Sequence, residues 1–360
     1  SILFGDIDNV IMDTEYKTFA VAHATGGIVW SVIGIFGNSL MIATLLLVQE
    51  NRVPRNAFLV SLSVSDLLVS GISIPSGVAG VFLGKNYFDT HHTLCTIIST
   101  LCAPGCLGSI YSITWIAVSR YYYICDFPNY SRYFGGHKIA VYLAITWFMC
   151  FANHLPNHVG WGETRFSPGF RLCTIDIETH SYAVYYGCWI ALSIGISFTF
   201  YWKMYKKLRN STLTKKLIMK TQLSASEQRV AGEIRLIKTS FKVFVAYVLS
   251  WAPLCVLCLI GMRQEIPLPI YMTVILLAHG NSIINFFVYF VDNVKFRSQF
   301  RQIIGRLCGR KKVGPVHSTL SMAVTNLPRA PRPWDLPKTT TTTAPDDTKR
   351  VAVREAPIMA

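Results

Sequence analysis

The stretch of sequence that decides the fold is SLSVSDLLVSGISIPSGVAGVFL, residues 61–83. It is long enough to cross the hydrocarbon core of a bilayer as a helix, which takes about 20 apolar residues. Its apolar residues run continuously rather than in alternation, which excludes a strand of a β-barrel. Its one ionisable residue is Asp66, and a charge at this depth costs roughly 2.5 to 3.5 kcal/mol on insertion scales. This cost indicates that Asp66 faces the interior of a helical bundle.

The same pattern recurs along the rest of the chain. We count seven apolar runs, at residues 26–49, 57–83, 93–124, 137–159, 181–206, 236–262 and 268–291. The composition agrees, since 51% of the 360 residues are hydrophobic and 15% are charged, which is too apolar for a water-soluble domain of this length. We therefore predict an all-α membrane protein, with a seven-helix transmembrane bundle over residues 26–292 that follows an extracellular N-terminus at residues 1–25.

The distribution of Lys and Arg predicts the orientation of this bundle. The net charge is +15, and the basic residues gather after the first run, around the loop after the third run and above all between the fifth and sixth runs. The N-terminus is acidic instead, with Asp6, Asp8, Asp13 and Glu15. Because basic loops stay in the cytosol, we expect the N-terminus outside and the C-terminus inside a plasma membrane. The basic surface fits anionic lipid of the bilayer better than nucleic acid, and its charge alone does not separate contact with lipid from contact with a cytosolic protein partner.

Two segments follow the seventh run. Residues 293–308 place apolar side chains along one face and basic ones on the rest, which is typical of a short amphipathic helix in the membrane interface. Cys308 closes this segment and is a candidate for S-palmitoylation. Residues 309–360 are rich in Pro, Thr and Ser, so we expect a disordered cytosolic tail. Phosphorylation of its hydroxyl groups would make a receptor kinase and arrestin candidate partners, and a merely solvated tail is the alternative.

The cysteines predict one disulfide bond and no structural metal. Ten cysteines are too few for a disulfide scaffold in a chain of this length, and no CxxC pair repeats at zinc-finger spacing. Cys95 and Cys173 both fall on the outer side, where oxidation is favoured. A bond between them would tie the loop after the fourth run across the mouth of the bundle.

Several polar residues lie at the depth of Asp66 in other runs. They are Ser109 in the third run and Asn281, Ser282 and Asn285 in the seventh. Together with Asp66, their oxygen atoms suit a small site for a cation or for water molecules. A hydrogen-bond network with a purely structural role is the alternative.

Two further features favour helices that move. Arg120 at the cytosolic end of the third run and Glu233 at the start of the sixth are placed to form an interhelical ion pair that acts as a latch. Snorkelling of both side chains to water is the alternative. Pro253 follows Trp251 in the sixth run and removes one backbone hydrogen bond of the helix, which favours a hinge next to the large Trp251 side chain. Simple packing of the Trp is the competing explanation.

With these residues in view, the chain resembles the rhodopsin-like (class A) G-protein-coupled receptors over residues 26–308. The motifs that carry the resemblance are Gly37-Asn38, SLSVSDLL with Asp66, Ser119-Arg120-Tyr121 in place of the family's Asp-Arg-Tyr, Trp147, Trp251-Ala-Pro253, and Asn285-Phe-Phe-Val-Tyr289. The resemblance implies a G-protein switch formed by Arg120, Tyr121, Glu233, Tyr201 and Tyr289. It implies signal transmission through Trp251, Pro253 and Asn285. It implies no cofactor beyond an allosteric sodium ion, at Asp66, Ser109, Asn281 and Ser282.

The chain resembles the melatonin receptors of that family in particular. The segments concerned are GSIYSITWIAVSRYYYIC (residues 108–125), LPN (155–157) and NSIINFFVY (281–289). The asparagine with which melatonin receptors contact their ligand falls on Asn157. Their aromatic residue and glutamine after the loop cysteine fall on Ile175 and Ile177, and their histidine in the fifth span falls on Trp189. The contacts with ligand therefore differ at three of these four positions.

The resemblance also locates a ligand pocket. Its expected lining is Cys102, Cys106, Asn157, Ile175, Ile177, Trp189, Trp251 and His279. Cys102 stands where amine receptors place an aspartate, and His279 stands where opsins place the lysine that binds retinal. The mostly apolar lining suits a small neutral lipophilic or indole-like ligand. Arg165 and Arg171 in the outer loop would instead favour a carboxylate such as that of a fatty acid.

The expected function is therefore that of a receptor that passes the binding of an extracellular ligand to a heterotrimeric G protein. The inhibitory class of G protein is expected from the resemblance to melatonin receptors. A transporter or an intramembrane enzyme is the alternative from another class. However, the sequence has no internal repeat of the transporter type, and Asp66 with His279 would be the only obvious candidates for catalytic metal ligands. We therefore predict no enzymatic activity.

Overall fold

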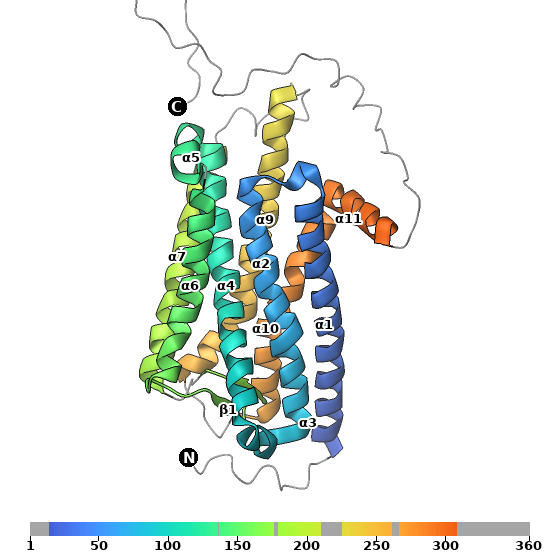
Figure 1. The fold of residues 1–360 in the computed structure, drawn as a ribbon, viewed down its shortest axis with the longest axis vertical. Coiled ribbons are helices and arrows are strands. Elements are labelled where there is room, and N and C mark those ends of the chain that lie inside the picture. Colours follow the sequence, from blue (N-terminus) through green and yellow to red (C-terminus); the bar gives the residue numbers. More distant parts are fainter. Residues whose placement is uncertain (1–13, 136, 176–178, 210–224, 261–265, 308–360) are drawn as a thin grey trace, which may run out of the picture. The chain divides into compact units, whose positions relative to one another are not determined.

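Seven helices in the described part of the chain are long and apolar enough to cross a membrane. In chain order they are α1 (Thr14–Leu47), the pair α2 (Ala57–Leu68) and α3 (Ile74–Thr90), α4 (His92–Cys125), α6 (Lys138–His154), α7 (His180–Arg209), α9 (Ala225–Ile260) and α10 (Leu268–Asp292) (Figure 1). The structure is a computed structural model that describes residues 14–135, 137–175, 179–209, 225–260 and 266–307. The prediction of an all-α membrane protein with seven spans is confirmed.

Two of these helices begin before the apolar runs that predict them. The helix α1 begins at Thr14 rather than near residue 26, so part of the predicted N-terminal segment is helical. The helix α9 begins at Ala225 rather than near residue 236. A helix keeps its backbone hydrogen bonds where it leaves an apolar environment, so hydropathy places its ends too far inward. Because of this extension, Glu233 lies on α9 itself.

The second span is one helix that a wide turn interrupts. Between α2 and α3 the segment η4 (Val69–Ser73) forms a π-helical turn, which adds a residue to the turn of the helix. The carbonyl oxygen of Ser70 in this turn accepts a hydrogen bond from the Ser31 hydroxyl of α1 at 2.7 Å. The hydroxyl of Ser70 in turn donates to the carbonyl oxygen of Asp66 at 2.6 Å. These bonds fix α1 against the second span next to Asp66.

The helix α4 lies at the centre of the bundle. It packs against α2, α6, α7 and α9. Gly108 allows α2 to come close, because a Cβ atom at this position would lie 2.3 Å from the Ser65 hydroxyl oxygen, and small residues are typical of such close helix contacts in membranes. From this central position α4 brings Cys102, Ser109 and Arg120 into contact with α10, α2 and α9 respectively.

Short elements lie at one end of the bundle, which we call the Arg120 end. The turns η2 (Gln49–Asn51) and η3 (Pro54–Asn56) join α1 to α2, and α5 (Phe127–Phe134) joins α4 to α6. The amphipathic helix α11 (Val294–Leu307) follows α10 (Figure 1) and buries Phe296, Phe300 and Ile303. Its position in a lipid interface stays a prediction. The predictions for Cys308 and for residues 309–360 lie outside the described residues.

A short hairpin lies at the opposite end, which we call the hairpin end. Its antiparallel strands are β1 (Arg165–Ser167) and β2 (Leu172–Thr174). Cys173 of β2 is disulfide-bonded to Cys95 of α4, so the predicted disulfide is confirmed. Arg171 is buried in the turn, and Arg165 is half-buried. Both arginines have interaction partners within the protein, so neither is a free, solvated cation.

Candidate functional site

Buried and half-buried polar or titratable side chains gather at three places in the bundle. We call these the core cluster (Asp66, Ser109, Asn281, Ser282 and Asn285), the thiol cluster (Cys102, Cys106 and His279) and the end cluster (Arg55, Arg120 and Glu233). The helices α4 and α10 contribute to both the core cluster and the thiol cluster. The end cluster lies at the Arg120 end and joins α4 to α9 and to the connection before α2.

The core cluster is organised around a buried carboxylate. Asp66 of α2 is 1% exposed and accepts hydrogen bonds from two other helices. The Ser109 hydroxyl of α4 donates to Oδ1 at 2.8 Å, and the Asn285 amide of α10 donates to Oδ2 at 2.5 Å. Both donors are neutral, and in the described part of the chain Asp66 forms no ion pair. Because a buried charge without an opposite charge is costly, a cation beside Asp66 would lower this cost.

The surroundings of Asp66 fit a small hard cation. Among the described residues, the Oδ1 atoms of Asn281 and Asn285 are buried and accept no hydrogen bond. A cavity of about 10 Å³ is lined by Asp66, Ser109, Asn281 and Ser282 among others, which is close to the space that one water molecule requires. The Ser282 hydroxyl donates to a carbonyl oxygen of its own helix. The cavity therefore offers the carboxyl group of Asp66, the hydroxyls of Ser109 and Ser282 and the free amide oxygen of Asn281, and oxygen ligands of this kind are those that hard cations prefer.

The structure brings together three of the predicted pocket residues. Cys102 and Cys106 of α4 and His279 of α10 have their sulfur and ring-nitrogen atoms within 4.8 Å of one another. All three side chains are buried. Cys106, His279 and Trp251 also line the cavity that reaches Asp66. The predicted ligand pocket and the predicted sodium site thus meet at one place.

The other predicted pocket residues lie on the elements of the hairpin end and on α7. Asn157 is buried in the 3-10 turn η5 (Leu155–His158), Ile175 is buried directly after β2, and Trp189 is half-buried on α7. None of these three residues lines the cavity beside Asp66. Ile177 lies outside the described residues.

Trp251 is positioned by ring stacking. Its indole ring stacks on Tyr247 of the preceding turn, with ring centroids 5.5 Å apart and an angle of 17° between the planes. Among the described residues, neither the indole N–H of Trp251 nor the hydroxyl of Tyr247 has a hydrogen-bond partner. Pro253 lies inside α9, where it removes one backbone hydrogen bond. The ring pair therefore lies next to a missing backbone hydrogen bond of α9 and is held by packing.

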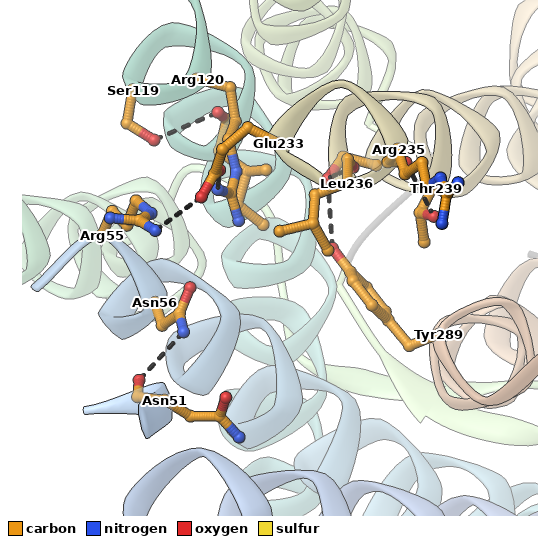
Figure 2. A network of polar contacts seen from close by, with 12 residues as sticks. Asn51, Arg55, Asn56, Ser119, Arg120, Glu233, Arg235, Leu236, Thr239 and Tyr289 are labelled. Carbon is orange, nitrogen blue, oxygen red and sulfur yellow. Dashed lines mark hydrogen bonds and ion pairs between the residues drawn. The ribbon is translucent and has the colours of Figure 1, made fainter. Parts of the chain in front are cut away.

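Glu233 of α9 lies between two arginines in the end cluster (Figure 2). Its Oε2 atom is 2.8 Å from Nη1 of Arg120, and its Oε1 atom is 2.7 Å from Nη2 of Arg55. The side chain of Arg120 is only 2% exposed, against 21% for Arg55 and 17% for Glu233. The guanidinium group of Arg55 also lies 4.3 Å from the centroid of the Tyr123 ring. The structure thus brings Arg120 and Glu233 together as the sequence predicts, and it adds Arg55.

In the described part of the chain, Glu233 is the only acidic residue that forms an ion pair with Arg55 or Arg120. Ser119, directly before Arg120, donates its hydroxyl hydrogen bond to the Ile116 carbonyl oxygen at 3.1 Å. Burial raises the pKa of Tyr130 on α5, although the nearby guanidinium groups of Arg55 and Arg120 oppose this shift. The Tyr130 phenol is therefore neutral at physiological pH and does not compete for the arginines.

The predicted tyrosine partners of the switch are buried but separate. The Tyr289 hydroxyl of α10 shares a hydrogen bond with the Ser240 hydroxyl of α9 at 3.2 Å (Figure 2). The Tyr201 hydroxyl of α7 is buried and has no hydrogen-bond partner among the described residues. Tyr121 is half-buried and packs edge-on against the Phe200 ring of α7.

Reasoning from the sequence missed three residues, one in the end cluster, one beside Trp251 and one at a separate junction of helices. Arg55 is one of several basic residues in a connection, and only its packing shows that it is paired. Tyr247 lies one turn before Trp251, a spacing that would have indicated their contact. Asn153 of α6 donates to the Tyr111 hydroxyl at 3.1 Å and accepts from the Tyr185 hydroxyl at 2.7 Å. An asparagine in an apolar run was the signal for this junction of α4, α6 and α7.

Comparison with known proteins identifies the class of receptor that this fold and these clusters define. Residues 37–289 match the model of the 7 transmembrane receptor (rhodopsin family), and the chain belongs to this family. It is therefore a multi-pass membrane receptor of the G-protein-coupled type, and not an enzyme. The crystal structure of squid rhodopsin has the same fold, with a TM-score of 0.67 and 21% identity, over 89% of this chain and 97% of that one.

Within the family, the chain is related to melatonin receptors. It is 27% identical to melatonin receptor type 1A of Ovis aries over 289 residues, which cover 78% of this chain and 76% of that receptor. It is 28% identical to melatonin receptor type 1C of Gallus gallus over 287 residues, which cover 77% of this chain and 80% of that receptor. The resemblance seen in the sequence motifs is confirmed.

Proposed function

We propose that this receptor passes the binding of a small neutral lipophilic or indole-like ligand to a heterotrimeric G protein of the inhibitory class. In the proposed orientation the hairpin end is extracellular and the Arg120 end is cytosolic, which is supported by the basic residues at the ends of α7 and α9. The ligand class is supported by the buried, uncharged side chains of Cys102, Cys106 and Trp251. The kind of G protein is supported by the relationship to melatonin receptors.

The observation that carries the proposal is the position of Glu233 between Arg120 and Arg55. These contacts hold α9 against α4, and in the proposal they belong to the closed conformation. A ligand that displaces Trp251 would turn α9 about its weakened point at Pro253. This movement breaks the contacts of Glu233 and opens the Arg120 end to a G protein.

The core cluster supplies a second control in this proposal. Asp66, Ser109, Asn281 and Ser282, with the free Oδ1 atom of Asn285, would hold a sodium ion. The ion, when bound, balances the charge of Asp66. Asn285 of α10 and Asp66 of α2 both belong to this cluster. A bound sodium ion would therefore change how closely α2 and α10 pack.

The experiment that tests the proposal measures G-protein dissociation in cells, across G-protein subtypes. Wild type is compared with Arg120→Ala and with Arg132→Ala, an exposed arginine of α5 at the same end that serves as the matched control. Melatonin, related indoles and medium-chain fatty acids are the ligands. A response to an indole that Arg120→Ala abolishes and Arg132→Ala retains supports the proposal.

Two other results would overturn parts of it. A response to fatty acids alone would replace the neutral ligand class by a carboxylate. A response that is equal in Arg120→Ala and wild type would show that Arg120 is not the switch. Surface expression of each variant is measured in the same cells, so that a lost signal is not a lost protein.

A further inference from the structure

The thiol cluster has the donor atoms of a metal site. Cys102 and Cys106 are one turn apart and therefore share a face of α4, and His279 of α10 lies opposite them. The Sγ atom of Cys102 is 3.9 Å from Nε2 of His279. The ligand atoms of all three residues lie within 4.8 Å of one another, and the side chains are 4%, 6% and 5% exposed. Among the described residues no other group of three such side chains converges in this way.

This set of donors is selective for one kind of metal. Two sulfur atoms and one imidazole nitrogen suit zinc, whereas hard cations such as Na⁺ and Mg²⁺ prefer oxygen. Bonds of about 2.3 Å to sulfur and about 2.1 Å to nitrogen place tetrahedral donor atoms roughly 3.5 to 3.8 Å apart. Side-chain rotations that move the donors by about 1 Å would therefore bring them into position around the ion. The cluster is thus close to a zinc geometry without any movement of the helices.

The space beside the cluster leaves a fourth position open. Cys106 and His279 line the cavity of about 10 Å³ that continues toward Asp66, which is close to the space for one water molecule. Three protein ligands with one open position are the arrangement found where zinc binds an exchangeable ligand. A water molecule in this cavity would complete the tetrahedron, and because the cavity has space for about one water molecule, it would do so in place of an ion beside Asp66.

The electrostatics of the bundle also favour zinc at this place. Two thiolates cancel the charge of Zn²⁺, so the filled site adds no net charge to a buried region. The two thiol protons leave when the metal binds. The Ser73 hydroxyl is buried and lies beside Cys102. A thiolate at Cys102 would give this hydroxyl an acceptor, which is the kind of second contact that orients metal ligands.

We propose that Cys102, Cys106 and His279 bind one zinc ion, which joins α4 to α10 at the base of the predicted ligand pocket. The inference concerns metal binding by the purified chain and does not depend on the proposed G-protein coupling. It also differs from the sodium site, because the donors are sulfur and nitrogen.

The test uses the purified full-length chain in detergent after treatment with a chelator. Zinc is added back and the bound metal is counted per chain, and Co²⁺ is added in parallel because thiolate coordination gives it a strong charge-transfer absorption. Cys102→Ala and His279→Ala are compared with Cys150→Ala, a buried cysteine of α6 outside the cluster. We expect one metal ion per chain and a thiolate absorption in wild type and Cys150→Ala, and at least a tenfold weaker affinity in the other two.

A measurement on the wild type covers the case in which a variant fails to fold. Zinc is expected to slow the alkylation of Cys102 and Cys106 by a maleimide at least tenfold, as followed by mass spectrometry of the peptides, and to leave Cys188 unprotected. Equal metal content in all variants would assign the metal to other cysteines and overturn the proposal. Absence of both stoichiometric metal and protection in the wild type would also overturn it.

Discussion

The core cluster and the end cluster both bury an acid, but they satisfy it in opposite ways. Asp66 receives two hydrogen bonds from neutral side chains, whereas Glu233 lies between two guanidinium groups. Among the described residues, the Asp66 carboxyl group thus has no basic partner, whereas Glu233 has two. A small cation could therefore pair with Asp66 in the core cluster without movement of a helix. In the end cluster both oxygen atoms of Glu233 already have a basic partner, so breaking these contacts requires that α9 move away from α4.

The largest effect is expected at Glu233, whose two ion pairs are predicted to latch α9 to α4. Glu233→Gln leaves Arg120 buried at 2% exposure without an opposite charge in the described part of the chain. The loss should cost the closed conformation about 1.5 to 3 kcal/mol, between the values for exposed and buried pairs, which is roughly a ten- to hundredfold change in the equilibrium. Signalling without ligand should therefore rise, as measured by G-protein dissociation at equal surface expression. Unchanged basal signalling would show that the ion pair is not a latch.

The next largest effect is expected at Asp66, where the core cluster is predicted to bind a cation. Asp66→Asn should abolish stabilisation by sodium and leave the fold intact. The fold survives because Ser109 keeps an acceptor, and the Asn285 amide can turn so that its unpaired Oδ1 atom accepts from the new amide.

The measurement needs no receptor ligand. Thermal unfolding of the purified chain is followed in sodium chloride and in choline chloride at the same ionic strength. In wild type, sodium at about ten times its dissociation constant should add roughly 1.4 kcal/mol to the free energy of unfolding. Ser112→Ala, in a buried Ser112–Ser61 hydroxyl pair whose residues do not line the cavity beside Asp66, is the control that should keep the sodium effect. A sodium effect that persists in Asp66→Asn would place the ion elsewhere.

The sequence predicts Asp66, Glu233 and most of their partners, but it does not predict the contact with Arg55. A continuous apolar run identifies each span, so an acid such as Asp66 within it stands out. The partner of an acid depends on how neighbouring helices are rotated and on where each one ends. Hydropathy does not contain this information, as the early beginnings of α1 at Thr14 and α9 at Ala225 show. Arg55 illustrates the limit, because its sequence context is that of an ordinary solvated arginine.

A smaller effect is expected at Arg55, which tests whether the second cation of the end cluster matters. Arg55→Ala removes one of two contacts to Glu233 and the stacking on Tyr123. Since the side chain is 21% exposed, the loss should be about 1 kcal/mol. Basal signalling should rise, but less than in Glu233→Gln. Arg52→Ala, an exposed arginine of the same connection, is the matched control, and an equal rise in both variants would deny Arg55 a specific role.

The smallest effect is expected at Lys242. This variant tests whether the burial of an ion pair, or only the number of ion pairs, holds the receptor closed. Lys242 of α9 pairs with Asp292 of α10 at 2.7 Å, so this pair also joins two spans at the Arg120 end. Its lysine is 58% exposed, and exposed pairs contribute only about 0 to 1 kcal/mol. Lys242→Ala should therefore leave basal signalling within twofold of wild type. A rise as large as that of Glu233→Gln would mean that any link between α9 and its neighbours holds the receptor closed, and that the buried position of Arg120 adds nothing.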